Sequence, residues 1–231
     1  MVTTADALPL IADDTWSITE ITYAFPTDVS NYPSDYGLLG ELDSFAAMPG
    51  SAVPLFEAAF RNYAEVINMD FRPAETGETA VIDIASSTAG NFAWAYFPST
   101  SREGGDMWFN TNAHNFGPLV SPPTNFHGIY VYHTILHELG HAMGLLHGHD
   151  VLPSDVDGME NSVMTYRSYV GDPIAAGYNN IAGHFSQSLM RLDIAAVTGS
   201  GCRWPPQIYR PSAPCDVPGC LPTWSGGRKS I

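Results

Sequence analysis

Residues 133–150, HTILHELGHAMGLLHGHD, contain five of the eight histidines of the chain. His137 and His141 are four residues apart, so on a helix both imidazoles project from one face, about 6 Å apart along the axis. Two ring nitrogens at this spacing can bind one metal ion, and Glu138 lies beside them as a candidate general base. The H-E-x-x-H pattern therefore predicts a zinc site that activates a water molecule.

A catalytic zinc site needs a third protein ligand and one open position. Gly144 and His147 extend the pattern to H-E-x-x-H-x-x-G-x-x-H. We expect a positive φ at Gly144, where a residue with a Cβ would be strained, so that the helix ends and His147 turns back toward the metal. An isolated H-E-x-x-H occurs by chance on ordinary helices, whereas this longer pattern rarely does.

The remaining histidines have weaker claims to a role. His133 lies one turn before His137 on the same face, and either competes as a ligand or has a structural role with its hydrogen bonds satisfied. The structural role is our expectation. His149 flanks the motif and is a second competitor. No ligand spacing supports a role for the other three histidines, which are His114, His127 and His184.

The elements that must position this helix are predicted from periodicity. Alternating or apolar runs predict strands at residues 18–26, 79–86, 91–98 and 104–110. Apolar residues at helical spacing predict helices at 54–68, 130–146 and 186–197, the last with Ser186 as its N-cap. Residues 111–128 are expected to form a loop. This order predicts an α+β fold with a twisted sheet on two long helices.

Composition and charge limit the partners. The 231 residues are 45% hydrophobic and 12% aromatic, which fits a packed globule and excludes a disordered chain. The net charge of −15 disfavours nucleic acid and anionic membranes, and we expect a monomer. No segment is long and apolar enough for a membrane span, and residues 1–16 do not resemble a signal peptide.

The character of the chain changes after residue 198. Residues 199–231 contain all three cysteines and a high share of the prolines and basic residues, with Asp216 as their one acidic residue. We therefore predict two parts, a catalytic domain at 1–198 and a poorly ordered or non-native tail at 199–231. The cysteines are Cys202, Cys215 and Cys220.

Two motifs together resemble a known group. HELGHAMGLLH resembles the metzincin zinc-peptidase signature, and SVMTYRSY at 162–169 resembles the methionine-containing turn below the zinc, with Met164. The order Met164 then Tyr166 resembles serralysins and astacins, and the segments NFAWAYFP, GGDMWFN and SLMRLDIAAV are similar to serralysin segments. The resemblance covers roughly residues 15–197.

The resemblance implies a zinc-dependent endopeptidase that cleaves extended polypeptides. It implies a mostly parallel sheet with an antiparallel edge strand, an active-site cleft, a C-terminal helix, and secretion. Its implied site residues are the zinc ligands His137, His141 and His147, the base Glu138, the displaceable ligand Tyr166, the apolar floor Met164, and the substrate-binding edge residues Trp94, Ala95 and Tyr96.

Some residues depart from the serralysin pattern. Gly148 replaces the proline that commonly follows the third histidine, the gap to Met164 is short, and no calcium-binding glycine repeats follow. A matrixin-like endopeptidase with calcium in loops such as 102–112 therefore stays open, as does a non-catalytic zinc protein that binds peptides, although Glu138 argues against the latter. The loop from Arg167 to Asn180 is expected to form the pocket beside the zinc. Arg167 either selects acidic or polar side chains of the substrate or, as we favour, is a solvated surface residue.

Overall fold

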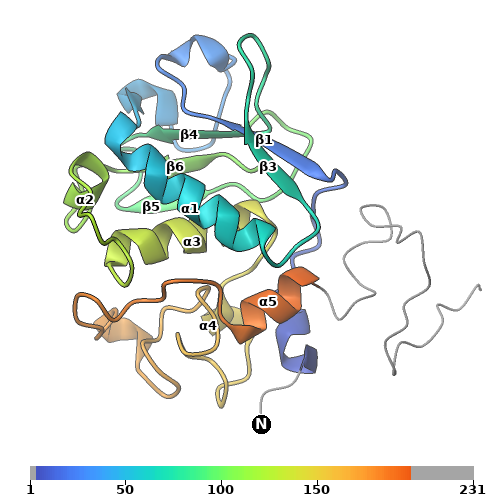
Figure 1. The fold of residues 1–231 in the computed structure, drawn as a ribbon, viewed down its shortest axis with the longest axis vertical. Coiled ribbons are helices and arrows are strands. Elements are labelled where there is room, and N and C mark those ends of the chain that lie inside the picture. The colour runs from blue at the N-terminus through green and yellow to red at the C-terminus, as the bar shows by residue number, and fades with distance from the viewer. Residues whose placement is uncertain (1–3, 199–231) are drawn as a thin grey trace, which may run out of the picture.

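A computed structural model describes residues 4–198, and its centre is a six-stranded sheet (Figure 1). The main strands follow the order β3 (Asp70–Pro73), β1 (Glu20–Ala24), β4 (Ile82–Ser86), β6 (Met107–Phe109) and β5 (Ala93–Ala95). The first four are parallel and β5 is antiparallel to β6, while the two-residue β2 (Ala46–Ala47) pairs antiparallel with β4. The predicted α+β fold with a mostly parallel sheet and an antiparallel edge strand is confirmed.

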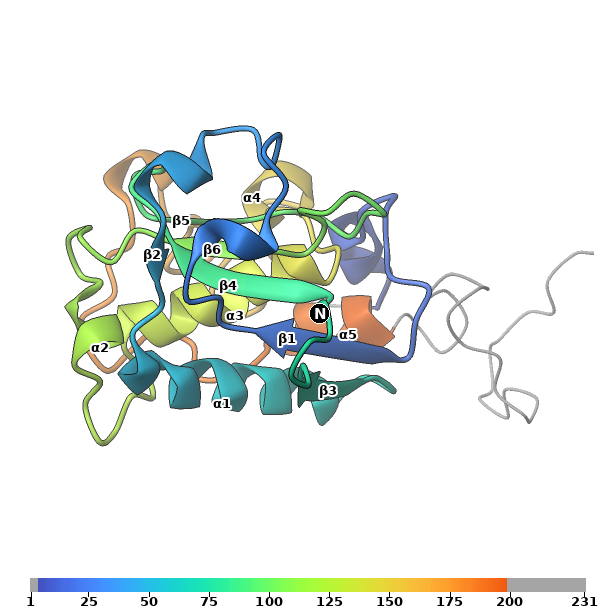
Figure 2. The same ribbon diagram turned by 90° about the horizontal axis from the view of Figure 1, so that it is seen from above.

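Two long helices lie on the same side of this sheet, α1 (Val53–Ala64) and α3 (Tyr130–Ala142) (Figures 1 and 2). The apolar face predicted for α1 is buried, with Phe56, Phe60 and Tyr63 in the main core. The Tyr63 hydroxyl donates a hydrogen bond to the carbonyl of Leu136 over 3.0 Å, which ties α1 to the histidine helix. The other α-helices of the described residues are shorter: α2 (Gly117–Val120), α4 (Gly148–Val151) and α5 (Arg191–Thr198).

Several boundaries differ from the prediction, for local reasons. Helix α3 ends at Ala142 rather than at residue 146, because Gly144 has a φ of +90°. Helix α5 begins at Arg191 rather than at residue 186, and Ser186 does not cap it. Instead Asp193 accepts a 2.8 Å hydrogen bond from the backbone N–H of Met190, as the third residue of a capping box does.

Other elements were missed because their sequences carry little periodic signal. The strand β3 contains Pro73 and is partly exposed, β2 has two residues, and α2 forms a single turn in the region expected to be loop. The predicted strand at 91–98 shortens to β5, so that Tyr96 follows the strand rather than belonging to it. The positions of these short elements are therefore determined by tertiary contacts rather than by the periodicity of their own residues.

The segment before β1 holds the chain that leads to His147. Its 3₁₀ helix (Thr4–Leu10) lies beside α5 (Figure 1). Leu10 then accepts a 2.7 Å hydrogen bond from the N–H of Leu146, and Ala12 donates one of 2.8 Å to the carbonyl of Gly144. The turn after α3 is therefore held by two backbone hydrogen bonds to the same N-terminal segment.

The predicted tail at 199–231, with its three cysteines, lies outside the described residues and stays a prediction, as does the domain boundary at 198. Within residues 4–198, none of the helices has the length and apolar character needed to cross a membrane.

Candidate metal centre and substrate cleft

His137 and His141 are oriented by backbone carbonyls. The Nδ1 atom of His137 lies 2.8 Å from the carbonyl oxygen of Val163, and that of His141 lies 2.7 Å from the carbonyl oxygen of Leu145. A carbonyl oxygen only accepts, so each Nδ1 carries the proton and each Nε2 presents a lone pair. This is the tautomer that a metal ligand needs, fixed by the hydrogen bond of its other nitrogen.

His147 is brought to the same point by the turn at Gly144. The Nε2 atom of His141 lies 3.1 Å from that of His137 and 3.0 Å from that of His147. A Cβ on Gly144 would lie 2.9 Å from the carbonyl oxygen of Asp14, so only glycine fits this turn. The predicted positive φ and the predicted convergence of the three imidazoles are both present.

The residues fit a divalent cation. Burial lowers the pKa of His137 and His141, the latter to about 4, so that both rings are neutral near pH 7. Their Nε2 lone pairs then face each other at hydrogen-bond distance without a proton between them, which is repulsive unless a cation lies there. The ligand nitrogens of the three histidines lie within 4.8 Å of one another, and three neutral imidazoles are a typical ligand set for zinc.

The burial of Glu138 also favours a cation beside it. Its side chain is buried, and Oε2 has no hydrogen-bond partner among the described residues. Loss of solvation raises the pKa of this carboxyl to about 8. An uncompensated buried carboxyl is costly, and a neighbouring divalent cation would favour its ionised form.

Met164 packs beneath the histidine helix. It is fully buried, and a Cβ on Gly140 would collide with its Sδ and lie 3.0 Å from the hydroxyl of Tyr63. The glycine between the two helical histidines therefore lets the turn carrying Met164 approach α3. The position agrees with the apolar floor expected from the sequence.

Tyr166 lies at the edge of the histidine cluster. Its hydroxyl is 2.9 Å from Nε2 of His147, and its ring stacks on His149 with centroids 4.3 Å apart. Burial raises the pKa of the phenol to about 12, so it stays a neutral donor. His149 thus has a packing contact, although a second group of metal-binding types, His147, His149 and Asp150, also occurs there.

The edge strand β5 presents backbone rather than aromatic side chains to the cleft. Phe92 and Tyr96 form backbone hydrogen bonds with the β6 side, which by alternation leaves the amides and carbonyls of Ala93 and Ala95 facing outward. The side chains of Trp94 and Tyr96 pack against a second hydrophobic cluster, where both donate to the buried Glu41. Sequence reasoning did not anticipate this use of the two aromatic residues.

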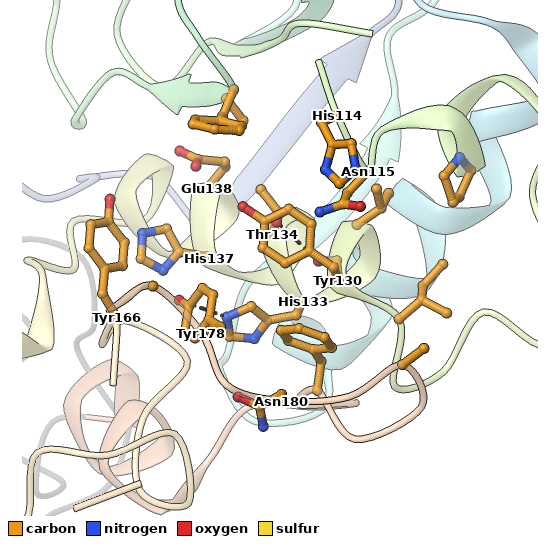
Figure 3. Close-up of a pocket in the computed structure, with 18 of the residues that line it drawn as sticks. His114, Asn115, Tyr130, His133, Thr134, His137, Glu138, Tyr166, Tyr178 and Asn180 are labelled. Carbon is orange, nitrogen blue, oxygen red and sulfur yellow. Dashed lines mark hydrogen bonds between the residues drawn. The ribbon is translucent and has the colours of Figure 1, made fainter. Parts of the chain in front are cut away.

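A cavity of about 860 Å³ opens beside His137 and Glu138 (Figure 3). We call it the aromatic pocket, because most of its wall comes from ring-bearing and aliphatic side chains. Residues of the loop at 167–180 contribute to it, as expected, but Arg167 does not. The guanidinium of Arg167 is 2.6 Å from Asp157 and also donates to the carbonyl of Asp172, so it braces the loop. The aromatic pocket is lined by Phe92, Ala93, His114, Asn115, Pro118, Ile129, Tyr130, Val131, His133, Thr134, His137, Glu138, Tyr166, Ile174, Gly177, Tyr178, Asn180, Ala182 and Phe185.

His133 belongs to this pocket and is only half satisfied. Its Nε2 lies 3.1 Å from the hydroxyl of Tyr178, while its Nδ1 is buried without a partner among the described residues. His114, to which the sequence assigned no role, lines the pocket as well. The helical spacing of His133 to His137 suggested a competing ligand or a structural histidine, and no spacing singled out His114. Neither observation predicts a pocket, because the residues that surround the two side chains come from other segments.

The loop considered for calcium holds an ion pair. Asp106 is fully buried and accepts hydrogen bonds from the hydroxyl of Tyr36 and the backbone of Asp83, and its carboxylate lies 3.3 Å from Arg102. Its oxygens are thus already engaged. A calcium ion remains a prediction, which no contact in the described structure supports.

Comparisons with known proteins agree with this geometry. The family model described as Matrixin matches residues 15–154. The chain belongs to the matrixin peptidase family. The chain is also similar to serralysins, which supports a metzincin catalytic domain of serralysin-like type.

Serralysin G of Dickeya chrysanthemi is 26% identical over 194 residues, which cover 74% of this chain and 38% of that protein. Serralysin C of the same organism is 27% identical over 195 residues, covering 77% and 37% respectively. Metallopeptidase AprA of Pseudomonas marginalis is 25% identical over 173 residues, covering 73% and 33%. The chain thus spans less than two-fifths of the length of these family members.

Proposed function

We propose that this chain is a zinc-dependent endopeptidase that hydrolyses peptide bonds of extended polypeptides. The observation that carries the proposal is the convergence of three imidazoles, with separations of 3.0 and 3.1 Å between their Nε2 atoms, beside the buried Glu138, whose Oε2 has no partner among the described residues. His137, His141 and His147 would hold the zinc. Family membership supports the peptidase class.

A zinc ion held there would supply Lewis acidity, which polarises a peptide carbonyl and makes a water molecule more acidic. Glu138 takes the proton of the attacking water and then gives it to the leaving amine. The hydroxyl of Tyr166, directed at His147, donates a hydrogen bond to the oxyanion as it develops. Met164 keeps the floor of the site apolar and dry.

The substrate would bind as an added strand along β5. The outward backbone groups of Ala93 and Ala95 offer alternating donors and acceptors to an extended peptide. Such a strand would place a peptide bond near the histidine cluster, because α3 packs directly against β5. Trp94 and Tyr96, which were expected to contribute with Ala95, then act through their backbone and through the packing that holds the strand.

Casein hydrolysis, with and without a zinc chelator, tests the proposal. We expect activity that is lost on chelation and restored by zinc. Glu138→Gln should retain one zinc per chain by metal analysis and lose nearly all hydrolysis, and Glu75→Gln, on an exposed turn, serves as the control. Retained turnover in metal-replete Glu138→Gln would reject the assigned base, and zinc binding without any hydrolysis would favour the non-catalytic peptide binder.

Export and oligomeric state follow as further proposals. We propose that the enzyme acts outside the cell as a monomer on polypeptide substrates, since the serralysin resemblance implies secretion and the charge of −15 opposes self-association. Activity in the culture medium of the producing cells and the mass in solution check the two statements. Calcium dependence is checked in the same assay by adding calcium to the chelated enzyme.

A further inference from the structure

Two adjacent leucines are exposed on a loop beside the edge strand β5. The side chain of Leu38 is 82% exposed and that of Leu39 is 56% exposed. Glycines flank the pair, and Gly37 and Gly40 each have a φ of +76°, which a residue without a Cβ adopts at little cost. We call residues 37–40 the leucine loop. Most of the apolar surface of its two leucines is accessible to a ligand.

Hydrogen bonds join the leucine loop to the side chains of β5 and of the residue after it. The backbone N–H of Leu38 donates to the hydroxyl of Tyr96 over 3.0 Å, and that of Leu39 donates to the carboxylate of Glu41 over 3.1 Å. Glu41 is fully buried and also accepts from the hydroxyl of Tyr96. A Cβ on Gly37 would collide with the same carboxylate. The position of the leucine loop is therefore coupled to that of the edge strand.

The leucine loop lies on the face of the sheet away from the helices. Ala93 and Ala95 pack against the main core, on the side of α3. Trp94 and Tyr96 pack on the opposite face, in the second hydrophobic cluster. Figure 2 shows the segment of residues 32–40 on this opposite face, where it reaches beyond β5 at the edge of the sheet. The leucine loop therefore overhangs the edge at which the substrate strand would be added.

A strand added to β5 directs its side chains to the two faces in turn. Neighbouring residues across a ladder have their side chains on the same face, whichever way the two strands run. Substrate residues beside Ala93 and Ala95 therefore point toward α3 and the proposed zinc. The substrate residue beside Trp94 points to the other face, where the leucine loop overhangs the edge.

We propose that the leucine loop is a second substrate-binding site, which takes aliphatic side chains at alternate positions of the extended substrate, on the face away from the zinc. The inference rests on the proposed peptidase function. An aliphatic side chain there would bury its apolar surface against Leu38 and Leu39, whereas a polar side chain would lose hydration without gaining a partner. The loop thus adds selectivity for residues other than those that face the metal.

A scan of peptide substrates tests the proposal. Peptides carry Leu or Asn at one position at a time, and mass spectrometry locates the cleaved bond. We expect kcat/KM to favour Leu over Asn by about tenfold at a position that faces the leucine loop. In the double variant Leu38→Asn/Leu39→Asn this ratio should fall to near one, while the ratios at the two adjacent positions stay as they were. Both leucines are exposed, so the variant should fold.

Val29→Asn is the matched control, because Val29 is 44% exposed on the neighbouring 3₁₀ helix (Val29–Asn31) and forms no part of the leucine loop. It should keep every wild-type ratio. Unchanged ratios in the double variant, or an equal loss at adjacent positions, would overturn the proposal. A wild-type dimer in sedimentation velocity that the double variant abolishes would overturn it as well, because the leucines would then serve self-association.

A binding measurement separates this inference from the proposed function. Calorimetry on zinc-loaded Glu138→Gln compares a peptide that has Leu at alternate positions with one that has Asn there. We expect the Leu peptide to bind about tenfold more tightly, and the added double variant to abolish that difference. This difference without hydrolysis of any peptide or of casein by the wild type would reject the peptidase and keep the second site. Hydrolysis without the difference would reject the second site and keep the peptidase.

Discussion

Asp193 couples the C-terminal helix to the metal centre, and its charge makes a measurable prediction. Its carboxylate accepts hydrogen bonds from the Ser162 hydroxyl (2.6 Å), from the N–H of Val163 (2.8 Å) and from the N–H of Met190 (2.8 Å). The carbonyl of the same Val163 holds Nδ1 of His137. Asp193 thus fixes the turn that orients a proposed zinc ligand.

Burial raises the pKa of Asp193 from its usual 3.8 to about 6, against the lowering by its three hydrogen bonds. A raised carboxyl pKa means that the folded state binds the proton more tightly than the unfolded state. The contribution of Asp193 to the free energy of unfolding is therefore fully present below about pH 4 and is lost as the pH rises through about 6. At 1.36 kcal/mol for each pH unit between the two values, the loss is about 3 kcal/mol.

The variant Asp193→Asn isolates this effect. Its amide oxygen can accept from Val163 and Met190, and its amide N–H can donate to the oxygen of Ser162, so the local structure is kept while the charge is removed. The free energy of unfolding of the variant, relative to the wild type, should rise by about 3 kcal/mol between about pH 4 and pH 7.

Urea denaturation of the metal-free proteins across this pH range is the assay. Other titrating groups, including the buried histidines, cancel in the difference between the two proteins. Asp155→Asn, on an exposed loop, is the control and should give a flat difference. A flat or falling difference for Asp193→Asn would refute the reasoning, because the hydrogen bonds would then outweigh burial.

Three further predictions concern the site itself. Tyr166→Phe should lower kcat on the order of 100-fold with little change in KM, because one donor to the oxyanion is removed. This fall in kcat should be smaller than that of Glu138→Gln in steady-state kinetics, and an equal fall would give Tyr166 another role. Gly140→Ala should destabilise the protein by ~1–3 kcal/mol, because its methyl would meet Met164, as thermal or urea unfolding will show. Gly144→Ala should cost roughly 1 kcal/mol or more and weaken zinc affinity, because it strains a φ of +90° against Asp14; unchanged zinc binding would contradict this.

Local periodicity in the sequence predicted the longer elements of the fold. The amphipathic pattern of α1 and the apolar runs of β1 and β4 are local, and both kinds of element formed where they were expected. The strand β3 and the single turn of α2 were not predicted, because their sequences carry little periodic signal and their places depend on contacts with β1 and with the turn before α1. Helix α5 starts later than predicted, at Arg191, where Asp193 in its first turn accepts a hydrogen bond from the backbone N–H of Met190 and Ser186 plays no part.

The sequence by itself determined the spacing of the metal-binding residues. Helical periodicity places His137 and His141 on one face, and the conformational freedom of Gly144 lets His147 return, so neighbours in sequence sufficed to predict their convergence. Only the tertiary structure decided what surrounds them. The aromatic pocket, the unpaired nitrogen of His133 and the support of His137 from Val163 join segments that are distant in the chain, and such contacts depend on packing rather than on any local pattern.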